Sequence, residues 1–152
     1  MNAASPGFFV FNAASGQIPA AGQIAALNQN NTVNSATNMA QVSSYVQLFL
    51  TGQGLVPNAP PDGQGSTGAL STSSKPVVYI GGSQATVSYS GLAPGYPGLW
   101  QINVQVPQNP ILPEGFPTNI FPVQVLYEGL TSNIPANNGN PSLATTIAIK
   151  AQ

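Results

Sequence analysis

Residues 91–107, GLAPGYPGLWQINVQVP, decide the fold of this chain. In the second half of this stretch apolar and polar residues alternate without interruption, with Trp100, Ile102, Val104 and Val106 set against Gln101, Asn103 and Gln105. Side chains of a strand point alternately to its two faces, so the pattern predicts a strand with one buried and one polar face. Pro107 ends it, because proline has no N–H for a ladder. We expect Trp100 at the centre of the core, where a large aromatic side chain joins two sheets.

Other segments also carry the β-branched, aromatic or alternating residues that favour strands. These are residues 8–11, 24–28, 32–33, 43–51, 76–80, 85–90, 120–128 and 144–150. Gly81-Gly82-Ser83-Gln84 predicts a hairpin turn between two of them, and no segment shows the helical period. The pattern predicts an all-β chain: one immunoglobulin-like β-sandwich of about seven or eight strands over residues 1–152.

Three features predict how individual segments lie. Residues 43–51 carry bulk on both faces, which is typical of a central strand that is covered on both sides. Pro122 places the start of strand 120–128 at an edge or a bulge. Residues 34–40 predict a turn, with room for one helical turn. Residues 55–74 mix proline, glycine and hydroxyl residues without periodicity, so they predict a long loop that is functional or mobile.

The charge content is unusually low. Only 3% of the residues are charged, against roughly 25% in soluble proteins, although the hydrophobic content of 42% is ordinary. Electrostatic repulsion therefore does little to keep copies of the chain apart. We interpret the low charge as a sign of a subunit that packs against copies of itself. The alternative is that proteins of the source organism generally contain few charged residues.

Composition also bounds the partners and the compartment. No basic stripe is present, so nucleic acid is not an expected partner. No apolar run approaches the about 18 residues that a membrane span needs. Residues 1–7 lack the regions of a signal peptide, so we expect a chain that is already processed or a piece of a longer one. Much Gly, Pro, Asn and Thr with little charge favours an extracellular location.

Enzyme, metal and crosslink hypotheses have weak support. The chain has no His and no Cys, which excludes Ser-His and Cys-His catalytic sites and most transition-metal sites. A glycosidase site would need two of the three carboxylates of the chain to lie close together. Asp62-Gly63-Gln64-Gly65 resembles a calcium loop only slightly, because one carboxylate makes a poor site. Lys75 or Lys150 could form an isopeptide bond with Asn103 or Asn119 beside Glu128, but surface lysines are the expected reading. We predict no enzyme, no metal and no cofactor.

Several motifs resemble a known family. They are Gly81-Gly82, the run from Tyr89 to Gly95 and the run from Gly98 to Pro107, with upstream matches in residues 22–28, 50–54 and 62–63. Together they are similar, over nearly the whole chain, to the Solibacter-type uncharacterised C-terminal domain of secreted acidobacterial proteins. The resemblance implies an exported β-sandwich module and no particular activity.

The chain departs from that family pattern near its end. After Thr131-Ser132-Asn133 the family leads directly into the closing strand, whereas here ten residues, IPANNGNPSL, come first. Ten extended residues span up to about 33 Å, enough to carry the last strand onto a neighbouring molecule. The related sandwich that precedes the family domain is absent here, so we expect strand 8–11 to lack its usual partner.

These features predict a secreted structural protein that forms a pilus-like homopolymer by strand addition between copies. The candidate interface consists of Phe8, Phe9, Val10 and Phe11 in the first strand and Thr145, Ile147 and Ile149 in the last. The alternative is an adhesive or carbohydrate-binding module with surface glycans as partners. Tyr96, between Pro94-Gly95 and Pro97-Gly98, is the aromatic residue we expect to be displayed to such a ligand. Asn30-Asn31-Thr32 also matches a glycosylation sequon, which is a weak signal.

Overall fold

The computed structural model describes residues 4–11, 22–132 and 144–151, and everything below concerns these residues. They contain no helix and twelve strands, so the predicted all-β class is confirmed in them. The strands are β1 (Gly7–Phe8), β2 (Gly22–Gln23), β3 (Ala26–Asn28), β4 (Ala40–Gln41), β5 (Tyr45–Thr51), β6 (Leu70–Ser71), β7 (Val77–Ile80), β8 (Ser83–Leu92), β9 (Trp100–Gln105), β10 (Ile120–Tyr127), β11 (Leu130–Thr131) and β12 (Thr145–Lys150).

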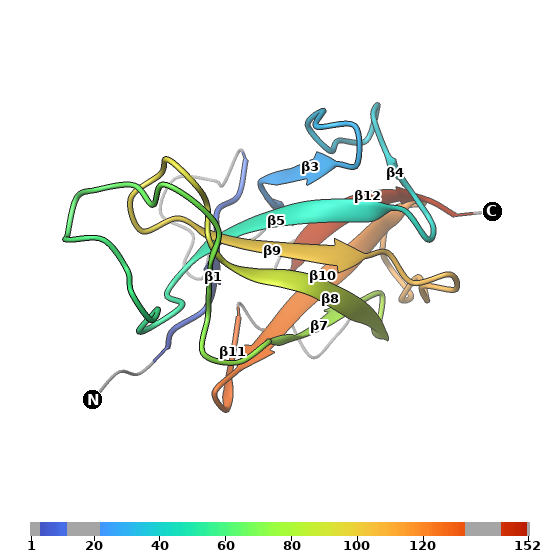
Figure 1. Ribbon diagram of the computed structural model, residues 1–152. Helices are drawn as coiled ribbons and strands as arrows, with labels where there is room; N and C mark the ends of the chain where they lie inside the picture. The colour runs from blue at the N-terminus through green and yellow to red at the C-terminus, as the bar shows by residue number, and fades with distance from the viewer. Residues whose placement is uncertain (1–3, 12–21, 133–143, 152) are drawn as a thin grey trace.

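The strands form one curled, mixed sheet in which the hydrogen-bonded order is β1-β5-β9-β8-β7-β10-β12-β2 (Figure 1). Four short strands pair beside this path: β3 on β5, β4 on β12, β6 on β8 and β11 on β10. The path returns to its beginning, because Phe11 N–H donates to Gln23 O at 2.8 Å and Ala25 N–H donates to Phe9 O at 2.7 Å. An immunoglobulin-like sandwich of two separate sheets is therefore not confirmed.

Two long strands curl the sheet by changing neighbours along their length. Residues 83–85 of β8 pair with β7, while residues 86–92 pair with β9 past an irregularity between Val87 and Tyr89. In the same way, residues 120–122 of β10 pair with β12 and residues 123–126 pair with β7. Pro122 lies at this change of partner rather than at an outer edge, because a residue without an N–H fits where one ladder ends and the next begins.

The core confirms the buried position predicted for Trp100, but it lies inside one curled sheet and not between two sheets. Its side chain is fully buried and lies against Tyr127 of β10, with ring centroids 5.2 Å apart. The indole Nε1 donates a hydrogen bond of 2.9 Å to Ser90 Oγ, which is 2.8 Å from Thr72 Oγ1. The core thus contains a satisfied polar chain around its largest residue, as a buried indole N–H requires.

The prediction that strand 43–51 is covered on both faces is wrong for β5. Val46, Leu48 and Leu50 are at most 1% exposed, whereas Tyr45 on the opposite face is 43% exposed. The central position of β5 is correct, because β9 pairs along one edge and β1 and β3 share the other. The bulky residues on the outer face of β5 therefore reflect a preference for strand conformation, and they do not show that this face is buried.

Both terminal segments complete the sheet of their own chain. Phe8 of β1 pairs with Leu50 of β5, so the expectation that the first strand lacks a partner is wrong. β12 lies between β10, to which it is antiparallel, and the short strands β2 and β4, to which it is parallel. The sheet of the described chain is thus complete. Association of copies by strand addition would require a strand that is already paired in its own chain to leave it.

Candidate functional site

Two loops at one end of the sheet line a partly open cavity. One is the long segment 52–69 between β5 and β6, and the other is the turn 93–99 between β8 and β9 (Figure 1). The cavity has a volume of about 440 Å³ and is lined by residues 53–56 and 59–64 together with Leu92, Pro97 and Gly98. The predicted loop 55–74 is mostly irregular, but Leu70 and Ser71 pair with β8 as β6.

Backbone contacts hold the two loops against each other. Gly95 N–H donates to Ser66 O at 2.8 Å, and Gln53 Nε2 donates to Gly98 O at 3.4 Å. Gly65 lies so close to Gly95 that a Cβ on it would be 2.5 Å from the Gly95 carbonyl carbon. Because no side chain fits at this contact, the glycine in the first loop fixes the distance between the cavity walls.

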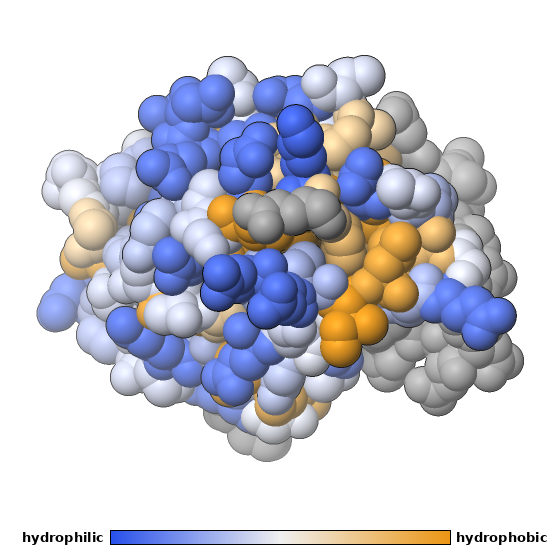
Figure 2. All heavy atoms as spheres, turned by 90° about the vertical axis from the view of Figure 1, so that its right-hand side faces the viewer, coloured by the Kyte–Doolittle hydropathy of each residue, from blue (hydrophilic) through white to orange (hydrophobic). Residues whose placement is uncertain are grey.

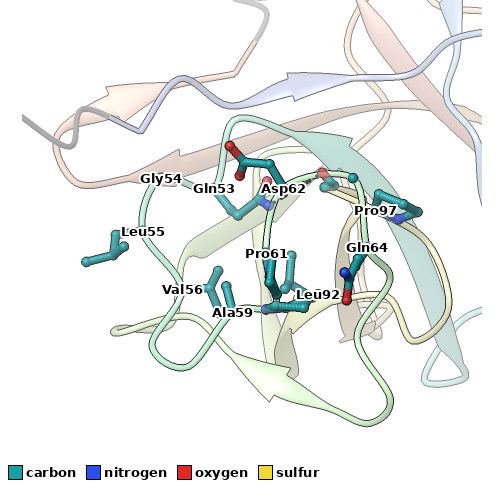
Figure 3. A pocket seen from close by; sticks show the side chains of 13 residues that line it. Gln53, Gly54, Leu55, Val56, Ala59, Pro61, Asp62, Gln64, Leu92 and Pro97 are labelled. Atoms are coloured by element: carbon teal, nitrogen blue, oxygen red, sulfur yellow. Dashed lines mark hydrogen bonds between the residues drawn. The ribbon is translucent and has the colours of Figure 1, made fainter.

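The cavity has an apolar centre and a polar rim. Val56, which is 4% exposed, and Leu92, which is 5% exposed, lie at the centre beside Ala59 and Pro61 (Figure 3). Gln53, Asp62 and Gln64 stand around them in the same view, from the same loop. An apolar floor with a few polar groups around it is the usual composition of a small-molecule site.

The polar rim suits neutral, hydroxyl-rich ligands better than ions. Two amides can both donate and accept hydrogen bonds, and a carboxylate accepts several. Asp62 is the only carboxylate in the lining, whereas calcium takes six to eight oxygen ligands. In the described residues no group of three or more acidic, His or Cys side chains is placed to hold a metal ion.

Tyr96 lies in the turn that supplies one wall of this cavity. Its side chain is 64% exposed, as the flanking Pro-Gly pairs predict, and its N–H closes a turn on Ala93 O at 3.2 Å. Gly95 and Gly98 on either side adopt positive φ values of 82° and 65°. The turn that contributes Pro97 and Gly98 to the cavity therefore also exposes an aromatic ring, on a backbone with little freedom.

Tyr89 supports the cavity floor from β8. Its hydroxyl donates to Leu92 O at 2.8 Å, next to the β6 pairing at Leu70. Burial raises the pKa of the Tyr89 phenol, and a hydrogen bond with the Leu70 backbone lowers it to a smaller extent. The neutral hydroxyl is thus the form that fits here.

A second site surrounds β12, the last strand. Thr145, Ile147 and Ile149, three residues of the predicted polymer interface, are all at most 1% exposed within their own chain. Along the parallel edge of β12 the partners are β2, then the side chain of Asn34, then β4. Asn34 was predicted only as part of a turn, because a single amide in a polar segment has no pattern that marks it as buried.

The first-strand residues of the predicted interface divide between the core and the surface. Phe8 is buried and Val10, which pairs with Ile24, is half-buried. Phe9 and Phe11 are 47% and 45% exposed. The segment thus offers two exposed aromatic side chains, while its backbone pairs with β5 at residues 7–8 and with residues 23–25 at residues 9–11.

The structure does not bring the other chemical candidates together. Lys75 is exposed and donates to Val87 O at 3.3 Å, and Lys150 is also exposed, whereas an isopeptide crosslink requires a buried lysine. Glu114 and Glu128 are exposed on different segments. Asn30 is exposed, and its Oδ1 accepts a hydrogen bond of 2.6 Å from the Thr32 hydroxyl.

Comparison with protein-family models, curated proteins and solved structures found no match to this chain. Function is therefore inferred from the geometry of the two sites. In the described residues no helix has the length and apolar character of a membrane span.

Proposed function

We propose that this chain is a non-enzymatic binding module of the cell surface that holds a neutral carbohydrate in the cavity between its two end loops. The observation that carries the proposal is the cavity itself, with its apolar centre at Val56 and Leu92 and its polar rim of two glutamines and one carboxylate. Pyranose rings have apolar faces and hydroxyl edges, so they match both parts. Tyr96, exposed in the turn that contributes Pro97 and Gly98 to the cavity, supplies a ring on which a sugar that extends from the cavity can stack.

The extracellular location belongs to the same proposal. The resemblance to an exported module, the low charge and the many small polar residues all agree with it.

Binding of defined neutral oligosaccharides tests this proposal. Tyr96→Ala should weaken binding about fivefold or more, because aromatic stacking contributes roughly 1 kcal/mol or more. Tyr45→Ala is the matched control: Tyr45 is also an exposed tyrosine, but it lies at the opposite end of β5 from the cavity loops. Titration calorimetry on both variants separates the outcomes. Failure of every neutral glycan to bind, or an equal loss in both variants, would rule out this site.

Self-assembly by strand exchange is a second candidate, and the very low charge of the chain is the observation that favours it. Five consecutive residues of this strand, 145–149, are buried, and it is linked to the rest of the chain through the ten-residue stretch 134–143 in the sequence. The contacts of such a strand are the same whether it comes from its own chain or from a neighbour. The near absence of charge, and the apolar patch on the side of the molecule that carries loop 106–119, also favour contact between copies (Figures 1 and 2).

Size-exclusion chromatography and negative-stain microscopy over a wide concentration range test the second candidate. Exchange predicts oligomers that grow with concentration and convert slowly, because a buried strand must leave its sheet first. A compact monomer at every concentration, after long incubation as well, would contradict it.

A further inference from the structure

We propose that Asn30 is the attachment site of an N-linked glycan, and that the polar hollow beside it holds the first sugar of that glycan. The inference goes beyond carbohydrate binding in the cavity and draws only on the extracellular location proposed above. It is carried by the hydrogen bonds of one turn, which leave the acceptor nitrogen of a sequon available, and by the amide side chains next to that turn.

Asn30 lies at the tip of a tight hairpin. The turn leaves β3 at Asn28 and returns at Thr32, whose carbonyl oxygen accepts a hydrogen bond of 2.8 Å from Asn28 N–H. Asn31 N–H donates to Asn28 O at 2.8 Å, and Asn31 has a positive φ of 61°, as is common for the last residue of a three-residue hairpin loop. Residues 30–32 are all exposed. A transferase can therefore reach Asn30 on the folded chain.

The spacing of the sequon orders the side chain of Asn30. Its Oδ1 accepts a hydrogen bond of 2.6 Å from the Thr32 hydroxyl and one of 3.2 Å from Thr32 N–H. An asparagine side chain reaches the backbone two residues further on, and a hydroxyl residue at that position adds a second donor. Nδ2 has no hydrogen-bond partner among the described residues, so it is available to carry a glycan. The sequon is the only one in the sequence, because proline disqualifies Asn140-Pro141-Ser142.

The new bond would join Asn30 Nδ2 to the anomeric carbon of a sugar that is activated as a pyrophosphate ester. The bond from that carbon to the pyrophosphate oxygen breaks, and the pyrophosphate leaves with the electron pair. Nδ2 gives one of its two protons to a base of the transferase, and no atom is oxidised or reduced. The two donors on Oδ1 stabilise the negative charge that gathers on this oxygen as the proton leaves, so they favour the reactive form of a weakly nucleophilic amide.

A polar hollow with a volume of about 510 Å³ adjoins the acceptor. Its lining includes five amide side chains and no charged one, and it consists of residues 28–30, residues 38–41 and Ser44. Two of the amides are anchored at one end: Gln29 Oε1 accepts from Tyr45 N–H at 3.0 Å, and Asn38 Nδ2 donates to Val33 O at 2.7 Å. The other ends, Gln29 Nε2 and Asn38 Oδ1, make no hydrogen bond to the described residues. They offer one donor and one acceptor in fixed positions to the hydroxyl groups of a sugar.

A glycan at this position leaves the cavity open. β3 and β4, which flank the hollow, lie at the opposite end of the sheet from loops 52–69 and 93–99 (Figure 1). Attachment at Asn30 should therefore leave the binding of neutral oligosaccharides in the cavity unchanged. The two sites can be tested separately on the same full chain.

Peptide mass spectrometry of the full chain isolated from its source tests the attachment. Enzymatic release of an N-glycan converts the acceptor asparagine to aspartate, and this conversion should appear at position 30. The purified chain should also be modified there by an oligosaccharyltransferase that is supplied with a lipid-linked oligosaccharide. Asn30→Gln and Thr32→Val should abolish the modification, and Thr32→Ser should retain it. Asn31→Gly is the matched control, because it keeps both sequon residues and suits the positive φ of this position.

The Met39 methyl group reports on the hollow, whose lining includes this residue. In a chain labelled at the methionine methyl groups, glycosylation of Asn30 should shift the Met39 signal and give a nuclear Overhauser effect to the first sugar. Met39→Leu identifies the signal by removing it. A glycan on Asn30 that leaves the Met39 signal unchanged would overturn the seating of the sugar in the hollow.

The remaining outcomes separate this inference from the function proposed for the cavity. An unmodified Asn30 in the chain from its source overturns the inference, whatever the calorimetric titrations of the cavity show. Modification of another asparagine, or modification that persists in Thr32→Val, overturns it as well. A glycan on Asn30 of a chain whose cavity binds no neutral oligosaccharide supports the inference and rules out the cavity as a carbohydrate site.

Discussion

Trp100 of β9 and Tyr127 of β10 meet with ring centroids 5.2 Å apart and ring planes inclined at 59°. Two strands, β8 and β7, separate β9 from β10 along the sheet. The contact therefore spans the interior of the curled sheet and joins its two halves face to face. An inclined pair of this kind adds to the area that both rings bury.

Trp100→Phe should lower the free energy of unfolding by about 2 to 4 kcal/mol, because it leaves a cavity and removes the donor to Ser90 Oγ. Urea denaturation followed by far-UV circular dichroism measures it. Ser90→Ala, which keeps the indole but removes its acceptor, should cost about 1 to 3 kcal/mol. Tyr96→Ala on the surface should change the value by less than about 0.5 kcal/mol. If Trp100→Phe and Tyr96→Ala lowered the free energy of unfolding equally, Trp100 would not be a central residue of the core.

The sequence predicted the strands that have enough residues to show a period. Alternation identified β9 and β10, and the Gly81-Gly82 pair identified the hairpin between β7 and β8. It also predicted the burial of Trp100 and the exposure of Tyr96, because each depends on immediate neighbours.

The rest depends on contacts that leave no local pattern. Strands of two residues, such as β2 and β4, are too short to alternate, yet they cover one edge of β12. The cavity arises where two loops about 30 residues apart touch at Gly65 and Gly95, and proline and glycine content indicates a loop without indicating what it packs against. The pairing of residues 9–11 with residues 23–25, which closes the sheet, could not be predicted either, because these segments are too short to show a pattern.

Gly65→Ala should open the cavity and weaken carbohydrate binding, because the added methyl group would overlap the backbone of Gly95. We expect a loss of about 1 to 3 kcal/mol in stability, as overpacking usually causes. Gly68→Ala is the matched control, since a Cβ there meets nothing within 4 Å. Calorimetric titration with a glycan that binds the parent chain, together with thermal unfolding, checks both. Loss of binding in both variants would show that the Gly65–Gly95 contact is not what holds the site.

Tyr89 should make the chain less stable at high pH. Burial raises the pKa of its phenol above the ordinary value of about 10, so the folded state binds the proton more tightly than the unfolded state does. This contribution is fully present below the unfolded pKa and is lost as the pH rises from there towards the folded pKa. Urea midpoints at about pH 8 and about pH 10.5 measure the decline, and Tyr89→Phe should reduce it. An identical decline in the variant would show that other groups cause it.

Asn34→Leu should release β12 before the rest of the sheet unfolds. The substitution leaves the N–H and C=O of Ala148 and the Oδ1 of Asn28 without partners, and it removes the 3.0 Å hydrogen bond from Gln23 Nε2. Each buried group without a partner costs about 1 to 3 kcal/mol, so several together can exceed half of the stability of an ordinary domain. Native-state hydrogen exchange should show the amide of Ala148 losing protection while amides of β9, on the other side of the core, keep theirs. Asn109→Ala, in an exposed loop, should change neither. Uniform loss of protection across β9 and β12 would mean that Asn34 stabilises the fold as a whole and does not act as a separate support for the last strand.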